Sequence, residues 1–293
     1  MNRERQIQAL AQALDVRIDT GVATPVGGGS INRCFRIATD DGVLFAKLGE
    51  PSDLSAYEAE AAGLAALGRA AAVRVPKLVA VGSEDALAYL VLEWIDFGPK
   101  TAIAERELGR RLAAQHRSTG PYFGWERDNT IGATAQLNQP GDDWIEFFRD
   151  RRLCHQLELA SARGLPDQVF SEARLLLDRM QRLLADHRPE ASLLHGDLWG
   201  GNWGADDAGT PYIFDPAVYF GDREVDLAMT RLFGGYGDAF YRAYAAEWPL
   251  ADGWEPRVDL YNLYHLINHF NLFGSGYLGS IRGALDSLMP YLR

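Results

Sequence analysis

The sequence changes character near residue 95, and this change limits the possible folds more than any other feature. Before it, short apolar segments typical of strands are separated by turn signals. Two of these segments, RCFRIAT at 33–39 and VLFAKL at 43–48, flank the hairpin signal DDG. A further segment, SDLSAYEAEAAGLAAL, is rich in alanine and leucine and begins with capping residues, which predicts a helix. The first part is therefore predicted to be a small antiparallel sheet that carries a helix.

The remaining segments predict two lobes of different structure. PKLVAVGS and LAYLVLEWI predict two more strands, and the opening MNRERQIQALAQAL predicts an amphipathic helix, not a signal peptide. After residue 95, amphipathic helical segments dominate, beginning with AERELGRRLAAQHRS. We therefore expect an α+β, bilobal fold, with a sheet lobe at 1–95 and a mainly helical lobe at 96–293. The boundary EWIDFG has no Gly/Ser-rich run, which predicts closely hinged lobes.

A glycine-rich turn, VGGGSIN, precedes the first long strand. Its residues Gly28, Gly29 and Ser30 are candidates for binding phosphate, because glycines let backbone N–H groups approach an anion closely. Taken alone the turn is weak support, since a simple connecting turn has the same composition.

A lysine inside an apolar strand, Lys47 in LFAKLGE, is the second candidate. By itself it is typical of an exposed strand face. The helix that follows contains Glu58 and Glu60, of which only one can face the sheet. In protein kinases a Lys held by a Glu positions the α and β phosphates of the nucleotide. Glu93 and Ile95, in the connector between the lobes, are also predicted to contact nucleotide.

The segment LLHGDLWGGNWG contains Asp197 and Asn202 in the spacing D-x-x-x-x-N. Protein kinases use this spacing in their catalytic loop, where the Asp accepts the proton of the substrate hydroxyl and the Asn binds metal. Gly196 stands where protein kinases have Arg. As an isolated string the segment is equally typical of a polar turn.

A short apolar strand ending in Asp215, within YIFDPA, is the fourth feature. In protein kinases an acidic residue at this place binds Mg²⁺, although an Asp-Pro turn after a strand is common. The order of all four features raises their weight, because each lies on the matching type of element. Together they predict a kinase-like site that uses ATP and Mg²⁺.

Composition excludes several classes of partner. The 293 residues carry a net charge of −11, which disfavours general binding to nucleic acid. The sequence contains no run of 18 apolar residues, so no membrane span is predicted. The two cysteines, Cys34 and Cys154, form no metal or disulfide pattern and fit a reducing cytoplasm. We expect a cytoplasmic protein without nucleic acid, membrane or an obligate protein partner.

The sequence resembles the fructosamine kinase family, also called ketosamine 3-kinases. The resemblance rests on LLHGDLWGGNWG, IFDPAVYFGDREVDLAM and LYNLYHLINHFNLFGSGYL, and on FGWERDNTIGATAQLN followed by WIEFFRDRRL. It covers nearly the whole chain. The Asp-Asn loop alone would indicate only the wider aminoglycoside and choline kinase group.

The resemblance implies a protein-kinase-like fold and transfer of the γ-phosphate of ATP to a sugar hydroxyl of a ketoamine, free or on a glycated protein. The phosphorylated adduct then breaks down and returns the amine. By motif position, Asp197 is implied as the base, Asn202 and Asp215 as metal ligands, and Lys47 as the phosphate contact with Glu60 as its partner. Many members have Cys where this chain has Ser30, so redox control there is not expected.

The acceptor pocket is predicted less sharply. His265, Asn268 and His269 share one helix face, either lining a cavity or bonded within the core. Trp199 either stacks on a sugar or packs under its loop. Arg223 and Asp226 match the family pattern, and we interpret Asp226 as a helix N-cap.

Two alternatives stay open. One is another hydroxyl kinase of the same fold, acting on an aminoglycoside, choline or a sugar. The other is a pseudokinase scaffold that binds nucleotide, which would not need Lys47, Asp197, Asn202 and Asp215 together.

Overall fold

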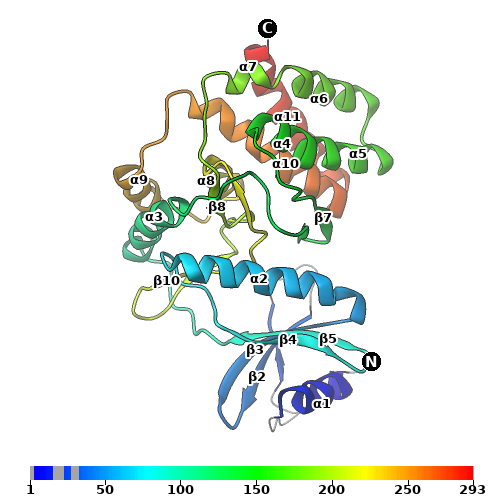
Figure 1. Ribbon diagram of the computed structural model, residues 1–293, viewed down its shortest axis with the longest axis vertical. Coiled ribbons are helices and arrows are strands. Elements are labelled where there is room, and N and C mark those ends of the chain that lie inside the picture. The colour runs from blue at the N-terminus through cyan, green and yellow to red at the C-terminus, as the bar shows by residue number, and fades with distance from the viewer. Residues whose placement is uncertain (1–2, 16–22, 28–32, 293) are drawn as a thin grey trace.

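The chain forms a sheet lobe and a helical lobe (Figure 1). The computed structural model describes residues 3–15, 23–27 and 33–292. The sheet has five antiparallel strands in the order β1-β2-β3-β5-β4. Its strands are β1 (Thr24–Pro25), β2 (Arg33–Thr39), β3 (Gly42–Gly49), β4 (Leu78–Glu84) and β5 (Leu87–Glu93).

The hairpin signal DDG lies where the sequence predicted it. Thr39 pairs with Gly42, so β2 and β3 are joined by Asp40 and Asp41. Gly42 has a φ of 136°, which side-chain-bearing residues rarely adopt. The register places Lys47 of β3 between its neighbours on β2 and β5, in the middle of the sheet.

Helices cover both faces of this sheet. α1 (Arg3–Leu14) buries Ile7 and Leu10 in one apolar cluster with side chains of β2, β3 and β5. α2 (Leu54–Ala70) buries Tyr57 and Leu64 in a second cluster with alternate side chains of β5. Because β5 lies between the two clusters, all its residues from 87 to 92 are buried. In Figure 1, α2 lies between the sheet and the helical lobe.

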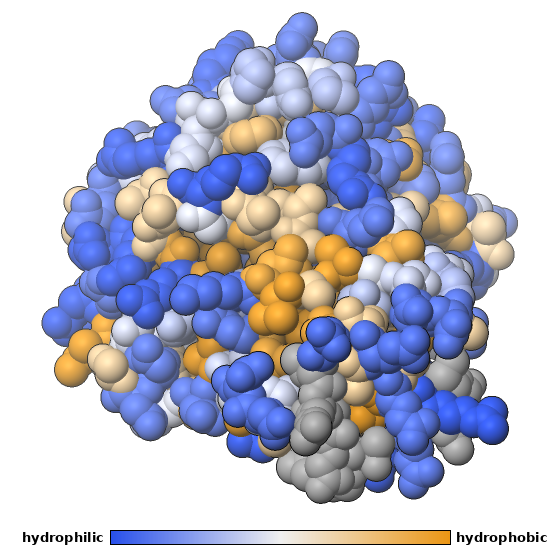
Figure 2. Space-filling view, turned by 60° about the horizontal axis from the view of Figure 1, so that its bottom comes forward, coloured by the Kyte–Doolittle hydropathy of each residue, from blue (hydrophilic) through white to orange (hydrophobic). Residues whose placement is uncertain are grey.

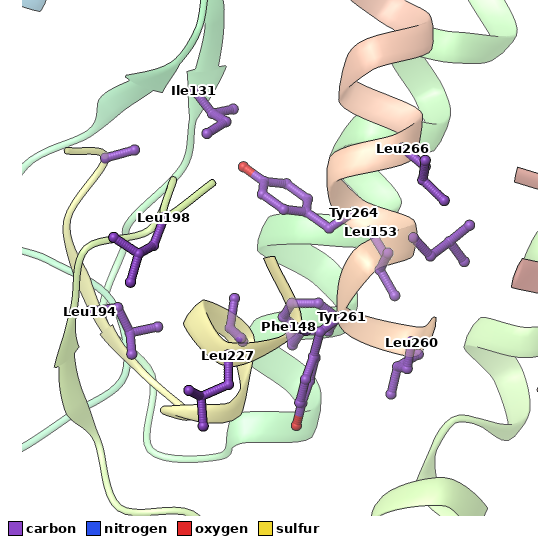
Figure 3. Close-up of a cluster of buried hydrophobic side chains, with 14 of the residues drawn as sticks. Ile131, Phe148, Leu153, Leu194, Leu198, Leu227, Leu260, Tyr261, Tyr264 and Leu266 are labelled. Carbon is purple, nitrogen blue, oxygen red and sulfur yellow. The ribbon is translucent and has the colours of Figure 1, made fainter. Parts of the chain in front are cut away.

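The helical lobe is organised around one long helix, α10, most of whose residues are buried. Figure 3 shows Tyr264 of this helix pointing toward Ile131 and Leu198, which come from other segments. The helices are α3 (Ala102–His116), α4 (Trp144–Phe147), α5 (His155–Ala162), α6 (Asp167–Arg179), α7 (Gln181–Leu184), α8 (Glu224–Leu232), α9 (Asp238–Glu247), α10 (Trp254–Phe273) and α11 (Leu278–Leu288).

Two of the predicted helices are less regular than their sequence periodicity indicated. The segment 144–160 contains a π-helical stretch, Phe148–Cys154, between α4 and α5. The segment 167–187 is divided at Met180 into α6 and α7. Short antiparallel pairs complete the lobe: β6 (Asn129–Ile131) with β7 (Thr134–Gln136), β8 (Ser192–Leu194) with β11 (Tyr219–Gly221), and β9 (Trp203–Ala205) with β10 (Pro211–Ile213).

The surface is mostly hydrophilic, with apolar residues gathered locally. In Figure 2 a band of apolar residues crosses the middle of the face drawn, between hydrophilic regions. The large apolar side chains that are exposed include Phe97, Phe233 and Phe273. In the part of the chain that the structure describes, no helix is both long and apolar enough to cross a membrane.

Candidate active site

Short strand pairs bring two distant loops side by side. The loop 195–202 follows β8, and the loop 214–218 lies between β10 and β11. The backbone N–H of Ala217 donates to the carbonyl of His195 at 2.8 Å, and that of Phe214 donates to the carbonyl of Asn202 at 3.0 Å. The two loops predicted to carry catalytic and metal-binding residues are therefore hydrogen-bonded to each other.

Asp197 and Asn202 lie together within the first of these loops. The side-chain amide of Asn202 donates to the Asp197 carbonyl at 2.9 Å and to its carboxylate Oδ2 at 3.1 Å. Burial raises the pKa of Asp197 to about 7, and the charge of Asp215 adds to this while the Asn202 bond opposes it. A carboxylate with its pKa near neutrality is suited to accept a proton.

Lys47 joins the two lobes through its ammonium group. Its Nζ lies 2.8 and 2.9 Å from the two carboxylate oxygens of Glu60, and 2.7 Å from Oδ1 of Asp215. Burial alone would lower the pKa of Lys47, but the Asp215 and Glu60 carboxylates hold it well above its usual range. Glu58, the other candidate in α2, points instead toward Arg127, 3.8 Å away.

Asp226 has a different part in the structure from the one predicted. It lies within the first turn of α8, whose N-cap is Arg223, and the N-cap interpretation is therefore wrong. Its buried carboxylate accepts the backbone N–H groups of His195 at 2.7 Å and Gly196 at 2.9 Å. It also lies 3.1 Å from Nε2 of His116. Asp226 thus holds the start of the loop 195–202.

His195, which holds the backbone of Asp197 in place, was not predicted from the sequence. Its ring accepts the Asp197 backbone N–H at Nδ1 (3.2 Å), and Nε2 donates to the carbonyl of Phe214 at 2.9 Å. Burial lowers the pKa of His195, which keeps the ring neutral and able to do both. Its position two residues before Asp197 was the available signal.

Gly196 is required for the approach of the two loops. Its φ is +82°, and a Cβ atom there would lie 2.0 Å from the carbonyl oxygen of Ala217. A side chain at this position would therefore force the loops apart. This explains why Gly occupies the place where protein kinases have Arg.

A cavity of about 800 Å³ contains most of the predicted site. Its lining includes Lys47, Glu60, Asp197, Asn202 and Asp215, from both lobes. The three candidate acceptor residues Trp199, Asn268 and His269 also line it.

The fourth acceptor candidate, His265, lies elsewhere. It is 1% exposed, it is not part of the cavity lining, and neither ring nitrogen has a hydrogen-bond partner within the described structure. Burial lowers its pKa to about 3. One turn of α10 therefore separates a core histidine from the cavity residues Asn268 and His269.

Of the remaining nucleotide candidates, the structure describes only Glu93 and Ile95. Gly28, Gly29 and Ser30 lie outside the described residues. Glu93 ends β5, and its carboxylate accepts the backbone N–H of Lys77 at 3.0 Å. Ile95 follows in the connector, and neither residue lines the cavity.

A network of hydrogen-bonded, buried polar side chains lies next to the cavity and was not predicted. Gln136 donates to Asn129 at 2.8 Å and to the carbonyl of Ala217 at 2.9 Å, and Tyr264 donates to Gln136 at 2.8 Å. Asn129, which lines the cavity, donates to the carbonyl of Val218 at 2.9 Å. The β6–β7 hairpin is thereby fastened to the segment that follows Asp215.

Comparison with known proteins gives consistent matches. A sequence model of the family described as fructosamine kinase matches residues 2–290. A "probable ketoamine kinase" of Synechocystis is 44% identical over 253 residues, covering 86% of this chain and 85% of that protein. A chloroplastic "protein-ribulosamine 3-kinase" of Arabidopsis thaliana is 40% identical over 271 residues, covering 92% and 82%.

Solved structures agree with the fold. The "putative fructosamine-3-kinase" of Thermobifida fusca matches with a TM-score of 0.86 at 30% identity, covering 99% of this chain and all (100%) of that chain. Aminoglycoside phosphotransferase APH(4)-Ia, in a thermostable mutant form, matches with a TM-score of 0.66 at 16% identity, covering 98% of both chains. The α+β, protein-kinase-like bilobal fold expected from the sequence is confirmed.

Proposed function

The chain belongs to the fructosamine kinase family, and from this premise we propose how its residues carry out phosphoryl transfer. It is an ATP-dependent phosphotransferase that acts on a sugar hydroxyl of ketosamines. The observation that carries the assignment of roles is the convergence of Lys47, Asp197, Asn202 and Asp215 on one cavity.

Asp197 is the general base in this proposal. The acceptor hydroxyl donates its proton to the carboxylate, its oxygen bonds to the γ-phosphorus, and the bond to the β–γ bridging oxygen breaks to release ADP. The raised pKa of Asp197 favours this transfer near neutral pH. His195 accepts the backbone N–H of Asp197, and the side-chain amide of Asn202 donates to the Asp197 carboxylate. Together they keep the carboxylate in place.

Lys47 is the proposed phosphate contact, and Glu60 orients it. The lysine is buried, so its charge is weakly screened by solvent and acts strongly on a nearby phosphate. We also propose that Gly28, Gly29, Ser30, Glu93 and Ile95 contact the nucleotide, as their places in the kinase-like order of motifs suggest.

Asn202 and Asp215 are the proposed ligands of Mg²⁺. The Asn202 amide nitrogen bonds to Asp197, so its oxygen remains for a metal, and Asp215 engages Lys47 through Oδ1 only. Oxygen donors of this kind suit Mg²⁺. When bound, the ion neutralises charge that develops between the β and γ phosphates.

The acceptor range and setting are also proposals. Ketoamines on small amines and on proteins are both proposed acceptors, and phosphorylation is proposed to promote loss of the sugar. A cytoplasmic location, without nucleic acid, membrane or an obligate partner, fits the acidic charge and the cysteine thiols. We further propose that the two lobes, 1–95 and 96–293, are closely hinged and not joined by a flexible tether.

A coupled ADP-release screen tests the proposal. Fructosyl-lysine and ribulosyl-lysine are compared with free fructose, choline and an aminoglycoside at matched concentrations. We expect ketoamine turnover to exceed the others, because a site that bonds sugar hydroxyls loses those bonds with the wrong acceptor. If choline or the aminoglycoside were faster than every ketoamine, the acceptor assignment would be wrong and only the kinase chemistry would stand.

A further inference from the structure

Four aromatic rings form a cluster in the described structure on the helical side of the cavity. Phe233 follows α8, His269 and Phe273 lie one turn apart on α10, and Tyr277 ends the short helical turn Ser275–Tyr277. Ring centroids of Phe233, Phe273 and Tyr277 lie 4.8, 5.6 and 5.0 Å from that of His269. We call these four residues the aromatic cluster.

The aromatic cluster belongs to the active-site cavity and reaches its mouth. All four rings line the cavity that also contains Asp197 and Trp199. Phe233 is 41% exposed and Phe273 is 50% exposed. Single exposed aromatic residues are ordinary, but a group of them at the rim of a site is typical of ligand binding.

His269 gives the cluster a hydrogen-bond acceptor. Its Nδ1 donates to the carbonyl of His265 at 2.8 Å, so the neutral ring carries its lone pair on Nε2. Burial lowers the pKa of His269, which favours this neutral form. Aromatic ring faces and a nitrogen lone pair attract a cation that has N–H groups and do not favour an anion.

We propose that the aromatic cluster binds the secondary ammonium of the ketoamine and the first carbons of its amine substituent. This inference rests on the proposed function, in which the sugar hydroxyl lies at Asp197. A ketoamine differs from a free ketose by this ammonium group, so the cluster is the part of the cavity that distinguishes the two. Its exposed edge leaves the rest of the amine outside, as an adduct on a peptide lysine requires.

The matched pair Phe273→Ala and Phe273→Leu tests the cluster. The acceptors are fructosyl-lysine and a 1-O-alkyl fructose, an uncharged ether of the same length. A cation over an aromatic face is worth about a two- to thirtyfold change in affinity. We expect both variants to raise KM for fructosyl-lysine by that factor, with a much smaller change in kcat. KM for ATP should stay near wild type, and binding of the ether should weaken much less than binding of fructosyl-lysine.

The control is Tyr291→Ala, which removes a 54% exposed aromatic residue outside the cavity lining. We expect it to leave KM for fructosyl-lysine unchanged. Two outcomes would overturn the proposal in favour of simple apolar packing. One is a wild-type KM for fructosyl-lysine in Phe273→Leu, and the other is an equal weakening of ether binding and ketoamine binding.

Calorimetric binding of fructosyl-lysine in the presence of ADP separates this inference from the proposed function. Binding that weakens in Phe273→Ala, without any ketoamine turnover by the wild type, would contradict the function and support the cluster. Turnover with an unchanged KM in Phe273→Ala and Phe233→Ala would support the function and overturn the cluster.

Discussion

The carboxylate of Asp226 accepts the backbone N–H of His195 at 2.7 Å, across 31 positions of sequence. The same carboxylate accepts the N–H of Gly196 and faces His116. A residue of α8 therefore holds the start of the loop 195–202, which contains the proposed base. This contact connects the packing of the helical lobe to the position of Asp197.

Replacing Asp226 by Asn tests that connection. The amide has one oxygen, so at least one buried N–H of the loop would face an NH₂ group and lose its acceptor. We expect a loss of about 1–3 kcal/mol in the free energy of unfolding and a fall in kcat of at least about tenfold through misplacement of the base. Denaturant unfolding and ADP release measure the two effects. Normal kcat at reduced stability would show that the contact does not position Asp197.

Asp197→Asn removes the proposed base and keeps its shape. We expect kcat to fall by about 10²- to 10⁴-fold, because proton transfer to a positioned base contributes that much. ATP should still bind, since the proposed phosphate contact at Lys47 is unchanged. ADP release and nucleotide titration check the two parts. Near-normal turnover would rule out Asp197 as the base.

Asn202→Ala and Asp215→Asn should weaken the binding of metal. We expect activity to require more Mg²⁺ in both variants, and excess Mg²⁺ to restore part of the activity of Asn202→Ala, because one oxygen ligand is lost while another remains. The control is Asp207→Asn, which changes an exposed carboxylate outside the cavity lining. Activity of the two site variants that does not vary with Mg²⁺ concentration would count against the ligand roles.

Gly196→Ala and Gly209→Ala form a matched pair. Both glycines have φ near +80°, at +82° and +78°, but a Cβ at Gly209 would meet no atom within 4 Å. We expect Gly209→Ala to cost about 1 kcal/mol of stability from backbone conformation alone. Gly196→Ala should cost more and also lower kcat, because its Cβ would strike the Ala217 carbonyl. Equal effects of the two substitutions on stability and activity would disprove the close approach.

The buried ring of His265 should make folding stability depend on pH. Its pKa is about 3 in the folded protein against 6.5 as the ordinary value, so below about pH 6.5 only the unfolded chain is protonated. Its contribution to stability is present above that pH and is lost as the pH falls toward 3, by about 1.4 kcal/mol at pH 5.5. We expect His265→Leu to reduce the difference in unfolding free energy between pH 7.5 and 5.5. An unchanged difference would mean that the ring titrates normally.

Local sequence was sufficient for the elements and for the order of the chemical groups. Strand alternation, the DDG turn and the helical periodicities depend on neighbours within a few residues, so the hairpin around Gly42 and the helices α2, α3 and α10 were predicted correctly. The order of Lys47, Asp197, Asn202 and Asp215 along the chain, on matching elements, was enough to indicate a kinase-like site.

Tertiary structure alone decided which side chains meet. The residue pattern left Glu58 and Glu60 open and only the family resemblance implied Glu60; the rotation of α2 against the sheet brings Glu60 to Lys47. Asp226 binds the catalytic loop instead of capping its own helix, and His265 lies in the core while Phe273 lies at the cavity mouth. These choices depend on the packing of segments far apart in sequence, whose buried polar groups must find partners across elements, and local periodicity carries no information about that packing.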